Sequence, residues 1–347
     1  RGNAPVMGVS AGNGFIMQSE KYSRDNAGQS LKKYILLKQG ELAYNHGASK
    51  AKQFGCCYEL TEPEARIPYV YHCFKINNHE YTPFIAMALN NAKMDKQLKR
   101  LVSSSVRMDG LLNISFEDYM SVTIHLPSPS EQKRIADFLQ KIDERIAAQE
   151  NLLASLKKYK RGAIAHILSG KNKEFSSTSS WMKKTLGDLC SEFRSGRNIS
   201  STLIHETGDY PVYGGNGIRG YCDRYSHEGE YVVIGRQGAL CGNVRIIQGQ
   251  NYLSEHAIAV RANADNDTGF LLYLLDFMKL GQYSDQGAQP GLAVNKLLRL
   301  KCTVPDKKTQ SNIASFLLRL DSQISNQEKM LSILINQRKA FLQQLFI

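Results

Sequence analysis

One segment of this sequence occurs twice. When residues 127–169 are shifted by 178 positions, they fall on residues 305–347 without a gap, and 12 of the 43 positions are identical. Two unrelated amphipathic helices can share a spacing of apolar residues, but they have no reason to share polar residues as well. The shared polar residues include Gln132 with Gln310, Asp143 with Asp321 and Gln149 with Gln327. We therefore interpret the segment as a true duplication, and the chain as a globular module followed by a long helix, present twice.

Both copies of the segment have the heptad pattern of a coiled coil. Apolar residues fill most a and d positions over five heptads, which start at Ile135 in the first copy and at Ile313 in the second. Two such helices in one chain pair most simply with each other, and antiparallel pairing puts the two modules at opposite ends. Ser130 is the expected N-cap of the first helix, because a serine oxygen accepts hydrogen bonds from the free N–H groups of the first turn.

Two glutamines interrupt the apolar seam. Gln149 and Gln327 occupy equivalent a positions near the middle of each helix. If they face each other they can form a hydrogen bond, and a slipped register would leave an amide unpaired. The alternative is that both lie at a solvated edge of the seam. We predict that this pair sets the helix register.

The duplication predicts five consecutive parts. They are a first module at 1–126, a first helix at 127–170, a linker at 171–180, a second module at 181–304 and a second helix at 305–347. Pro5-Val6 in the first module resembles Pro211-Val212 in the second, but four residues precede Pro5 whereas 30 separate Trp181 from Pro211. This difference predicts that about 25 residues are missing from the start of the first module.

Within the modules, short β-rich runs lie between glycine turns. Strands are expected at 34–37, 41–44, 69–74, 231–234, 244–247 and 258–260, and helices at 84–101 and 270–280. The predicted fold class is therefore α+β, with two modules separated by two long helices that form an antiparallel coiled coil.

The composition limits the classes of function that are possible, but it does not identify the function. The net charge is +12 and is spread along the chain, which permits binding of a polyanion over an extended face. Seven cysteines, an odd number with no C-x-x-C pair, argue against a disulfide framework and fit a reduced cytoplasm. No apolar run reaches the ~18–20 residues of a membrane span, so a membrane partner is not expected.

The usual catalytic motifs are missing from the sequence. Residues 215–220 match G-x-G-x-x-G by letter, but a turn-like segment follows instead of a helix, so we interpret them as a glycine-rich turn. No Walker A motif and no G-x-S-x-G motif occurs. His205, His227 and His256 have spacings that fit no common metal site. The sequence thus predicts a chain that is not an enzyme.

Several stretches resemble one known family. The run LPSPSEQKRIADFLQKIDERIAAQENLLASLKKYKRGAIAHIL resembles the central conserved helix of the specificity subunits of type I restriction-modification enzymes. The stretches WMKKTLGDLC, YPVYGGNGIRGY and EGEYVVIGRQGALCGNV resemble the start and middle of their target-recognition domains. The order module, helix, module, helix is also that of the family.

The resemblance implies a function in DNA recognition. Each module would be a target-recognition domain that recognises one half of a bipartite site in double-stranded DNA, and the paired helices would space the two domains. Two modification (methyltransferase) subunits would dock on the chain and bring S-adenosylmethionine, and restriction subunits that use ATP and Mg would join them. No cofactor is implied for this chain itself.

Polar side chains in the glycine-rich loops are the candidate DNA contacts, because sequence recognition needs donors and acceptors on a stable frame. In the second module they are Arg194, Arg197, Asn198, Asn216, Arg219, Arg236, Gln237 and Asn243, and in the first Asn13, Lys21, Tyr22, His46, Ser49, Lys50 and Lys52. Arg236 is the leading candidate, because it follows an expected strand and lies between two glycines that allow a close approach to DNA.

Two alternatives stay open at this point. Each arginine can equally be a solvated charge or a phosphate contact. A function of another class is also open: a pure scaffold that joins two partners through its duplicated helices and never touches DNA. A salt-dependent DNA-binding assay separates the scaffold from the DNA-recognition protein.

Overall fold

The computed structural model describes residues 4–21, 33–50, 52–77, 79–102, 111–169, 180–238, 240–285 and 291–346. The chain divides into two compact units. One unit contains Arg1–Gln149 together with Met330–Ile347, and the other contains Glu150–Lys329. Each unit therefore includes one module and parts of both repeat helices, so each module is grouped with part of the helix that belongs to the other repeat.

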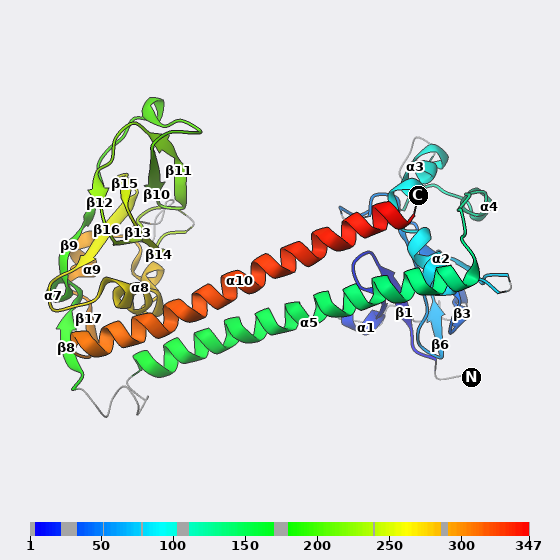
Figure 1. Ribbon diagram of the computed structural model, residues 1–347, viewed down its shortest axis with the longest axis horizontal. Coiled ribbons are helices and arrows are strands. Elements are labelled where there is room, and N and C mark those ends of the chain that lie inside the picture. The colour runs from blue at the N-terminus through cyan, green and yellow to red at the C-terminus, as the bar shows by residue number, and fades with distance from the viewer. Residues whose placement is uncertain are drawn as a thin grey trace. The chain divides into compact units, whose positions relative to one another are not determined.

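The duplicated segments form the two long helices. Helix α5 spans Pro129–Leu168 and helix α10 spans Lys307–Leu345 (Figure 1). The carbonyl oxygen of Ser128 accepts hydrogen bonds from the N–H groups of Glu131 and Gln132, so the N-cap is Ser128, two residues before the expected N-cap at Ser130. That prediction was wrong because Pro129, which has no N–H to satisfy, takes the first helical position.

In the first unit the two helices run antiparallel. Asp143 of α5 faces Arg338 of α10, with Nη2 donating to Oδ2 at 2.8 Å. Five residues earlier on α5, the ring of Phe138 meets Phe341 edge-on at 5.1 Å between centroids, three residues later on α10. Residue numbers thus rise along one helix as they fall along the other.

The second unit repeats this antiparallel arrangement. Lys157 Nζ lies 2.6 Å from Glu328 Oε1, and Lys160 forms an ion pair with Asp321. Many a and d positions are buried, as the heptads predict: in the second unit they include Ile167, Ile313, Leu317, Leu320 and Ile324, and in the first Leu139 and Leu334. The predicted antiparallel coiled coil is confirmed within each unit.

The first module mixes short strands and helices. Its elements are β1 (Met7–Ser10), β2 (Gly14–Met17), α1 (Gln18–Lys21), β3 (Ile35–Lys38), β4 (Leu42–Asn45), β5 (Cys56–Glu59), β6 (Glu64–Ile67), β7 (His72–Phe74), α2 (Thr82–Ala88), α3 (Ala92–Leu101) and α4 (Phe116–Met120). Strand β1 pairs with β2, β3 pairs with β6, and β4 lies between β5 and β7. The core that contains Tyr44, Phe84 and Leu98 is completed by Leu139 of α5 and by Phe346 just after α10.

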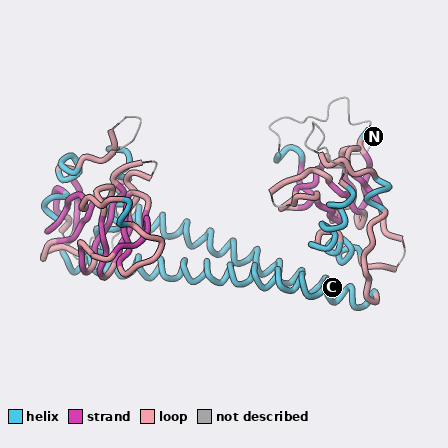
Figure 2. Tube along the Cα trace, turned by 90° about the horizontal axis from the view of Figure 1, so that it is seen from above, coloured by secondary structure: helices cyan, strands magenta, loops and turns pink. Residues whose placement is uncertain are grey.

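The second module contains two four-stranded sheets. Its strands are drawn in magenta among short helices and loops in Figure 2. Its elements are β8 (Met182–Thr185), α7 (Leu186–Leu189), β9 (Cys190–Ser195), β10 (Tyr210–Gly214), β11 (Gly217–Cys222), β12 (His227–Glu228), β13 (Tyr231–Gly235), β14 (Val244–Ile247), β15 (Gln250–Leu253), β16 (Ala257–Ala262), α8 (Thr268–Phe277), α9 (Val294–Leu298) and β17 (Lys301–Val304), with short 3-10 turns at Ser201–Leu203 and Leu280–Tyr283. The strand orders are β11-β10-β15-β12 and β14-β13-β16-β9, and β8 pairs with β17. Ile167 of α5 and Leu317 of α10 complete the core around Val232, Ile258 and Phe270.

The α+β prediction is confirmed, with differences in detail. The expected strands at 34–37, 41–44, 231–234, 244–247 and 258–260 coincide within a few residues with β3, β4, β13, β14 and β16, whereas only the end of 69–74 is a strand, β7. The single helix expected at 84–101 is two helices. Asn91 interrupts it, because its side chain accepts hydrogen bonds from the N–H groups of Lys93 and Met94 and so caps α3. In the part of the chain that the structure describes, no helix combines the length and apolarity that a membrane crossing needs.

Candidate functional site

The glycine-rich stretch of the second module is the turn of a β-hairpin. Strands β10 and β11 pair antiparallel, and Gly214 lies opposite Gly217. Gly217 has a φ of +109°, which a residue with a side chain rarely adopts. The turn itself is Gly215 and Asn216, and residues 217–220 belong to strand β11, where a dinucleotide-binding loop would start a helix.

This hairpin turn packs against two other loops. A Cβ atom added to Gly215 would lie 2.7 Å from the carbonyl oxygen of Gln237 and 3.2 Å from that of His256. Arg236 donates its backbone N–H to the same His256 carbonyl. The loops that follow β10, follow β13 and precede β16 therefore meet. They bring together five of the predicted contacts: Asn216, Arg219, Arg236, Gln237 and Asn243.

Arg236 is held by the protein itself. Its side chain is partly buried, Nη1 lies 3.3 Å from the carbonyl oxygen of Glu255, and Nε lies 3.4 Å from that of Leu292. These contacts leave fewer donors for a base than a fully exposed arginine offers. Gln237 is engaged as well, because its Oε1 lies 2.6 Å from Nδ1 of His256. The selection of Arg236 as the leading base contact stays a prediction.

Three other residues of this site are more exposed. Asn216, Arg219 and Asn243 all have exposed side chains around the hairpin turn. The sequence analysis missed Arg245 of β14, whose guanidinium packs directly against Gly217. Arg245 and Gly217 are far apart in sequence, and no local pattern signals their contact, because it depends on how the two sheets pack.

Arg194, Arg197 and Asn198 lie at and just after the end of β9, an edge strand of its sheet, and their side chains are exposed. Arg197 donates its backbone N–H to Leu253 at 2.8 Å. The side chain of Arg194 is fixed, because Nε donates to Oε1 of Glu192 at 2.6 Å. Burial raises the pKa of Glu192, but hydrogen bonds from Arg194 and Tyr231 and the nearby charges outweigh it and hold that pKa below its usual value.

The predicted contacts of the first module are dispersed. Asn13 is exposed in the turn between β1 and β2, and Ser49 and Lys50 are exposed in a turn. Lys52 Nζ donates to the carbonyl oxygen of Asn90 at 2.7 Å, which ties it to the end of α2. The side chain of Lys21 and the whole of Tyr22 lie outside the described residues.

His46 has a structural environment. It is 3% exposed, and its ring nitrogens lie 2.9 Å from the carbonyl oxygen of Leu112 and 2.8 Å from that of Val70. Both polar atoms of the ring are therefore occupied by the backbone, and a DNA base has none to contact. Burial of this kind has no signal in the sequence, where His46 looks like any polar residue beside a glycine.

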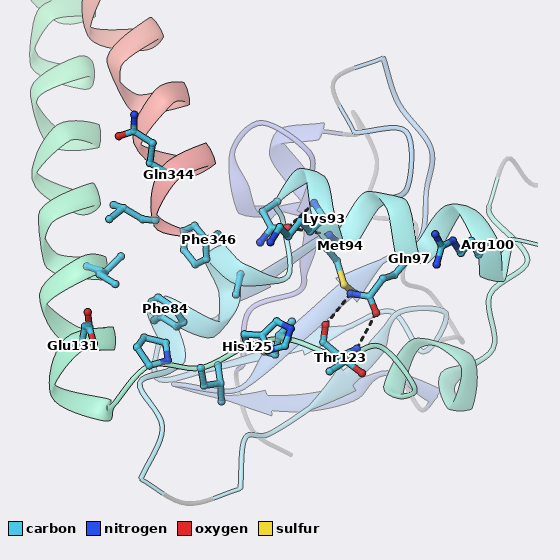
Figure 3. A pocket seen from close by; sticks show the side chains of 17 residues that line it. Phe84, Lys93, Met94, Gln97, Arg100, Thr123, His125, Glu131, Gln344 and Phe346 are labelled. Carbon is cyan, nitrogen blue, oxygen red and sulfur yellow. Dashed lines mark hydrogen bonds between the residues drawn. The ribbon is translucent and has the colours of Figure 1, made fainter.

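The first unit also contains a cavity of about 700 Å³. Side chains from α2, α3, the segment 123–127, the start of α5 and the end of α10 line it, among them Lys93, Arg100 and His125 (Figure 3). Gln97 of α3 forms two hydrogen bonds with the backbone of Thr123 and closes one side. None of the predicted DNA contacts lines this cavity, so it is separate from the loops described above.

No metal site is found among the described residues, because they contain no group of three or more His, Cys, Asp or Glu side chains close enough to share an ion. His227 is buried, with Nδ1 2.7 Å from Ser226 Oγ, and His256 contacts Gln237 and Glu255.

A family model described as the type I restriction modification DNA specificity domain matches residues 1–158 and again residues 178–334. The chain belongs to this family. The two matches also agree with the internal duplication, because each covers one module and most of the helix that follows it.

Several proteins and solved structures are similar to this chain. The specificity subunit of the type I restriction enzyme EcoprrI from Escherichia coli is 45% identical over 144 residues, which is 40% of this chain and 36% of that protein. The fold is similar to a crystal structure of the S subunit of a type I restriction-modification system from M. genitalium, with a TM-score of 0.68, 18% identity and coverage of 100% of this chain and 89% of that one. A chain from a structure of type I R-M complex assembly and conformational transition has a TM-score of 0.56 at 15% identity, with 98% and 91% coverage. The match to the curated relative thus spans only about a third of its length.

Proposed function

We propose that this chain determines the DNA sequence on which a type I restriction-modification complex acts. Each module recognises one half of a bipartite double-stranded site. The observation that carries this proposal is the convergence of three loops in the second module, two of them rich in glycine, where Asn216 and Arg219 are exposed beside Arg245. Amide and guanidinium groups on a rigid frame are the side chains that recognise base edges in the major groove.

The partners in this proposal are those of the family. Two modification subunits dock on the helices and modules and supply S-adenosylmethionine, and restriction subunits supply ATP- and Mg-dependent activity. The chain itself performs no chemistry. We therefore expect the purified chain alone to transfer no methyl group to any DNA, and methyl transfer by it would contradict this part of the proposal.

Selection from a randomised duplex pool tests the proposed function. The full chain, bound to its modification subunits, should enrich a split motif, and its affinity for DNA should fall steeply as salt rises, because phosphate contacts release counterions. A pure scaffold would enrich no sequence.

Arg236→Ala should then relax one half of the motif only, by about 1–3 kcal/mol at one base pair if the contact to guanine is bidentate. Equal loss in both halves would make Arg236 a structural residue or a phosphate contact.

The helices act as a spacer in this proposal. Helix α5 has 40 residues, which corresponds to about 60 Å of α-helix. Insertion of one heptad in each helix should lengthen the nonspecific gap by about three base pairs, since seven residues add ~10.5 Å and each base pair ~3.4 Å. Insertion in one helix alone should disrupt assembly. An unchanged gap after matched insertions would refute the spacer.

A further inference from the structure

A network of polar side chains in the second module ends on one exposed arginine. Glu192 of β9 accepts hydrogen bonds from Arg194 Nε at 2.6 Å and from the Tyr231 hydroxyl at 2.9 Å. His227 Nε2 lies 3.3 Å from the same carboxylate. The side chain of Glu192 is 16% exposed and that of Arg194 is 67% exposed. A largely buried carboxylate therefore holds an arginine that reaches into solvent.

The carboxylate is itself anchored to both sheets. Glu192 and Tyr231 belong to one four-stranded sheet, whereas His227 belongs to the other. On the far side of the histidine ring, Ser226 Oγ lies 2.7 Å from Nδ1 and accepts a hydrogen bond from the backbone N–H of Leu253 at 2.9 Å. The path from the backbone of β15 to the guanidinium is hydrogen-bonded except at one link, where the buried His227 Nε2 faces the Glu192 carboxylate at 3.3 Å without an aligned hydrogen bond.

Further contacts keep this network rigid. Arg261 stacks on the Tyr231 ring, with Cζ 4.2 Å from the centroid, and His227 meets the same ring edge-on at 5.1 Å. Burial lowers the pKa of His227 although Glu192 opposes the shift, so the ring is neutral near pH 7. A neutral ring can accept from the Ser226 hydroxyl at Nδ1 and carry its proton on Nε2, the nitrogen that faces the Glu192 carboxylate.

We propose that Glu192 is a positioning residue that fixes the Arg194 guanidinium as a guanine-recognising fork in the half-site of the second module. This inference rests on the proposed function. With Nε occupied by Glu192, the Nη1–Nη2 edge stays available, and two parallel N–H groups match guanine O6 and N7.

The carboxylate argues for a base contact over a phosphate contact. A phosphate is attracted to positive charge from any direction, and a carboxylate next to the arginine weakens that attraction. Base recognition depends on the geometry of the donors, which a fixed partner improves. An arginine whose charge is offset but whose orientation is locked is therefore suited to reading a base.

Pool selection with the full chain and its modification subunits tests the inference, using a randomised duplex as the probe. Arg194→Ala should lower discrimination for one G·C pair by about tenfold or more, and Arg194→Lys should do nearly the same, because lysine keeps the charge but loses the fork. Glu192→Gln should lower the same discrimination by about threefold to tenfold while affinity for nonspecific DNA stays equal or rises, since a negative charge has been removed.

A matched control separates positioning from charge. Glu228→Gln removes the same charge next to His227, but the Glu228 carboxylate accepts from Gln250 at 3.2 Å and contacts no arginine side chain among the described residues. We expect this variant to keep the wild-type motif. In the Arg194→Ala background, Glu192→Gln should have no further effect on the motif.

The outcomes are distinguishable. If the wild-type complex enriches no motif, the proposed function fails. If the wild-type complex enriches a split motif and Glu192→Gln leaves every position of that motif unchanged, the positioning role is refuted. The role is also refuted if Glu192→Gln weakens binding to all DNA equally in the wild-type and Arg194→Ala backgrounds. If Arg194→Ala lowers affinity for all sequences alike and reduces the salt dependence, Arg194 is a phosphate contact and the inference is overturned.

Discussion

Each module joins the long helix that follows it at a junction, and the two junctions are built around equivalent buried glutamines. In the first junction, Gln132 of α5 is fully buried, and its Nε2 donates to the Pro127 carbonyl oxygen at 2.9 Å and to the Glu80 carboxylate. Its Oε1 accepts from the backbone N–H of Tyr81 at 3.0 Å, at the residue that precedes α2. One side chain thus joins the start of the long helix to the start of a module helix.

The second junction reproduces this pattern with other partners. Gln310 is 1% exposed, and its Nε2 donates to the Pro305 carbonyl oxygen at 2.9 Å and to Asn266 Oδ1 at 2.8 Å. Its Oε1 accepts from the backbone N–H of Asp267 at 3.0 Å, which is the N-cap residue of α8. The glutamine and proline are shared by the repeats, whereas the module residues that they contact are not.

The ion pairs between the helices are duplicated in the same way. Asp143 and Asp321 are repeat equivalents, and so are their partners Arg338 and Lys160. In the second unit Asp321 also accepts a hydrogen bond from the Tyr273 hydroxyl of α8 at 2.8 Å. The comparison teaches that the helices and the glutamine that attaches each of them are kept between the repeats, while the module residues that they contact differ.

Removal of a buried leucine at equivalent positions should have the largest effect. Leu139 and Leu317 are both fully buried, each at the contact between a helix and its module. We expect Leu139→Ala and Leu317→Ala each to lower the free energy of unfolding by about 2–5 kcal/mol, measured by urea denaturation. Leu152→Ala, at a position that is 45% exposed, is the control and should change it by less than about 0.5 kcal/mol. A small effect of one leucine but not the other would show that the two junctions are not equivalent in packing.

Replacement of the buried glutamines should have the next largest effect. Gln132→Leu leaves the N–H of Tyr81 without its acceptor, and Gln310→Leu does the same to Asp267, so each should cost about 1–3 kcal/mol. Amide hydrogen exchange at Tyr81 or Asp267 should accelerate only in the matching variant. If exchange stays slow while stability falls, the loss comes from packing and the hydrogen bond is not the cause.

The sequence predicts this shared frame well because the signal there is local and repeated. The heptads locate α5 and α10, and the identity of Gln132 with Gln310 marks a position whose role only the structure reveals. The identity carries no information about the partners of the two glutamines, since Tyr81 lies 51 residues from Gln132 along the chain and Asp267 lies 43 residues from Gln310. The prediction of one helix at 84–101 failed for a similar reason, because the side chain of Asn91 caps a helix that the apolar pattern alone would continue.

The candidate site was less accessible to sequence reasoning. Polar residues near glycines are the predicted DNA contacts, and the structure gathers several of them around the hairpin turn of the second module. The same rule also selected His46, which the backbone occupies, and it missed Arg245 and Glu192, whose roles depend on contacts between strands. Burial and contacts between sheets are decided by tertiary packing, so a local rule cannot separate these cases.

Neutralising the duplicated aspartates should have a smaller effect. Asp143→Asn and Asp321→Asn should each lower stability by about 1 kcal/mol or less, because both pairs are partly exposed. The loss should be larger for Asp143, since Arg338 binds it through both Nε and Nη2, a geometry that lysine cannot provide. Arg338→Lys should then bring the first pair to the level of the second. An equal response of both aspartates in urea denaturation would indicate that the fork adds nothing.

The smallest expected effect concerns an ion pair that only the first junction has. Lys133 Nζ lies 2.7 Å from Asp137 Oδ2 on α5, and Ser311 and Ser315 occupy the equivalent positions of α10. The hydrogen bond from Lys133 lowers the pKa of Asp137 below its ordinary 3.8, with a further contribution from the Tyr81 hydroxyl at 3.3 Å.

A carboxylate whose pKa is lower in the folded than in the unfolded state stabilises the fold at any pH above the unfolded-state pKa. This stabilisation is lost as the pH falls through the folded-state pKa. We therefore expect Asp137→Ser to lower the urea midpoint slightly at pH 7 and to converge with wild type as the pH falls below the lowered pKa of Asp137. Ser315→Ala, at the matching exposed position of α10, should differ from wild type by the same small amount at every pH. A difference for Asp137→Ser that does not shrink with falling pH would mean that Asp137 acts through its uncharged contacts, and the two junctions would then respond alike to acid.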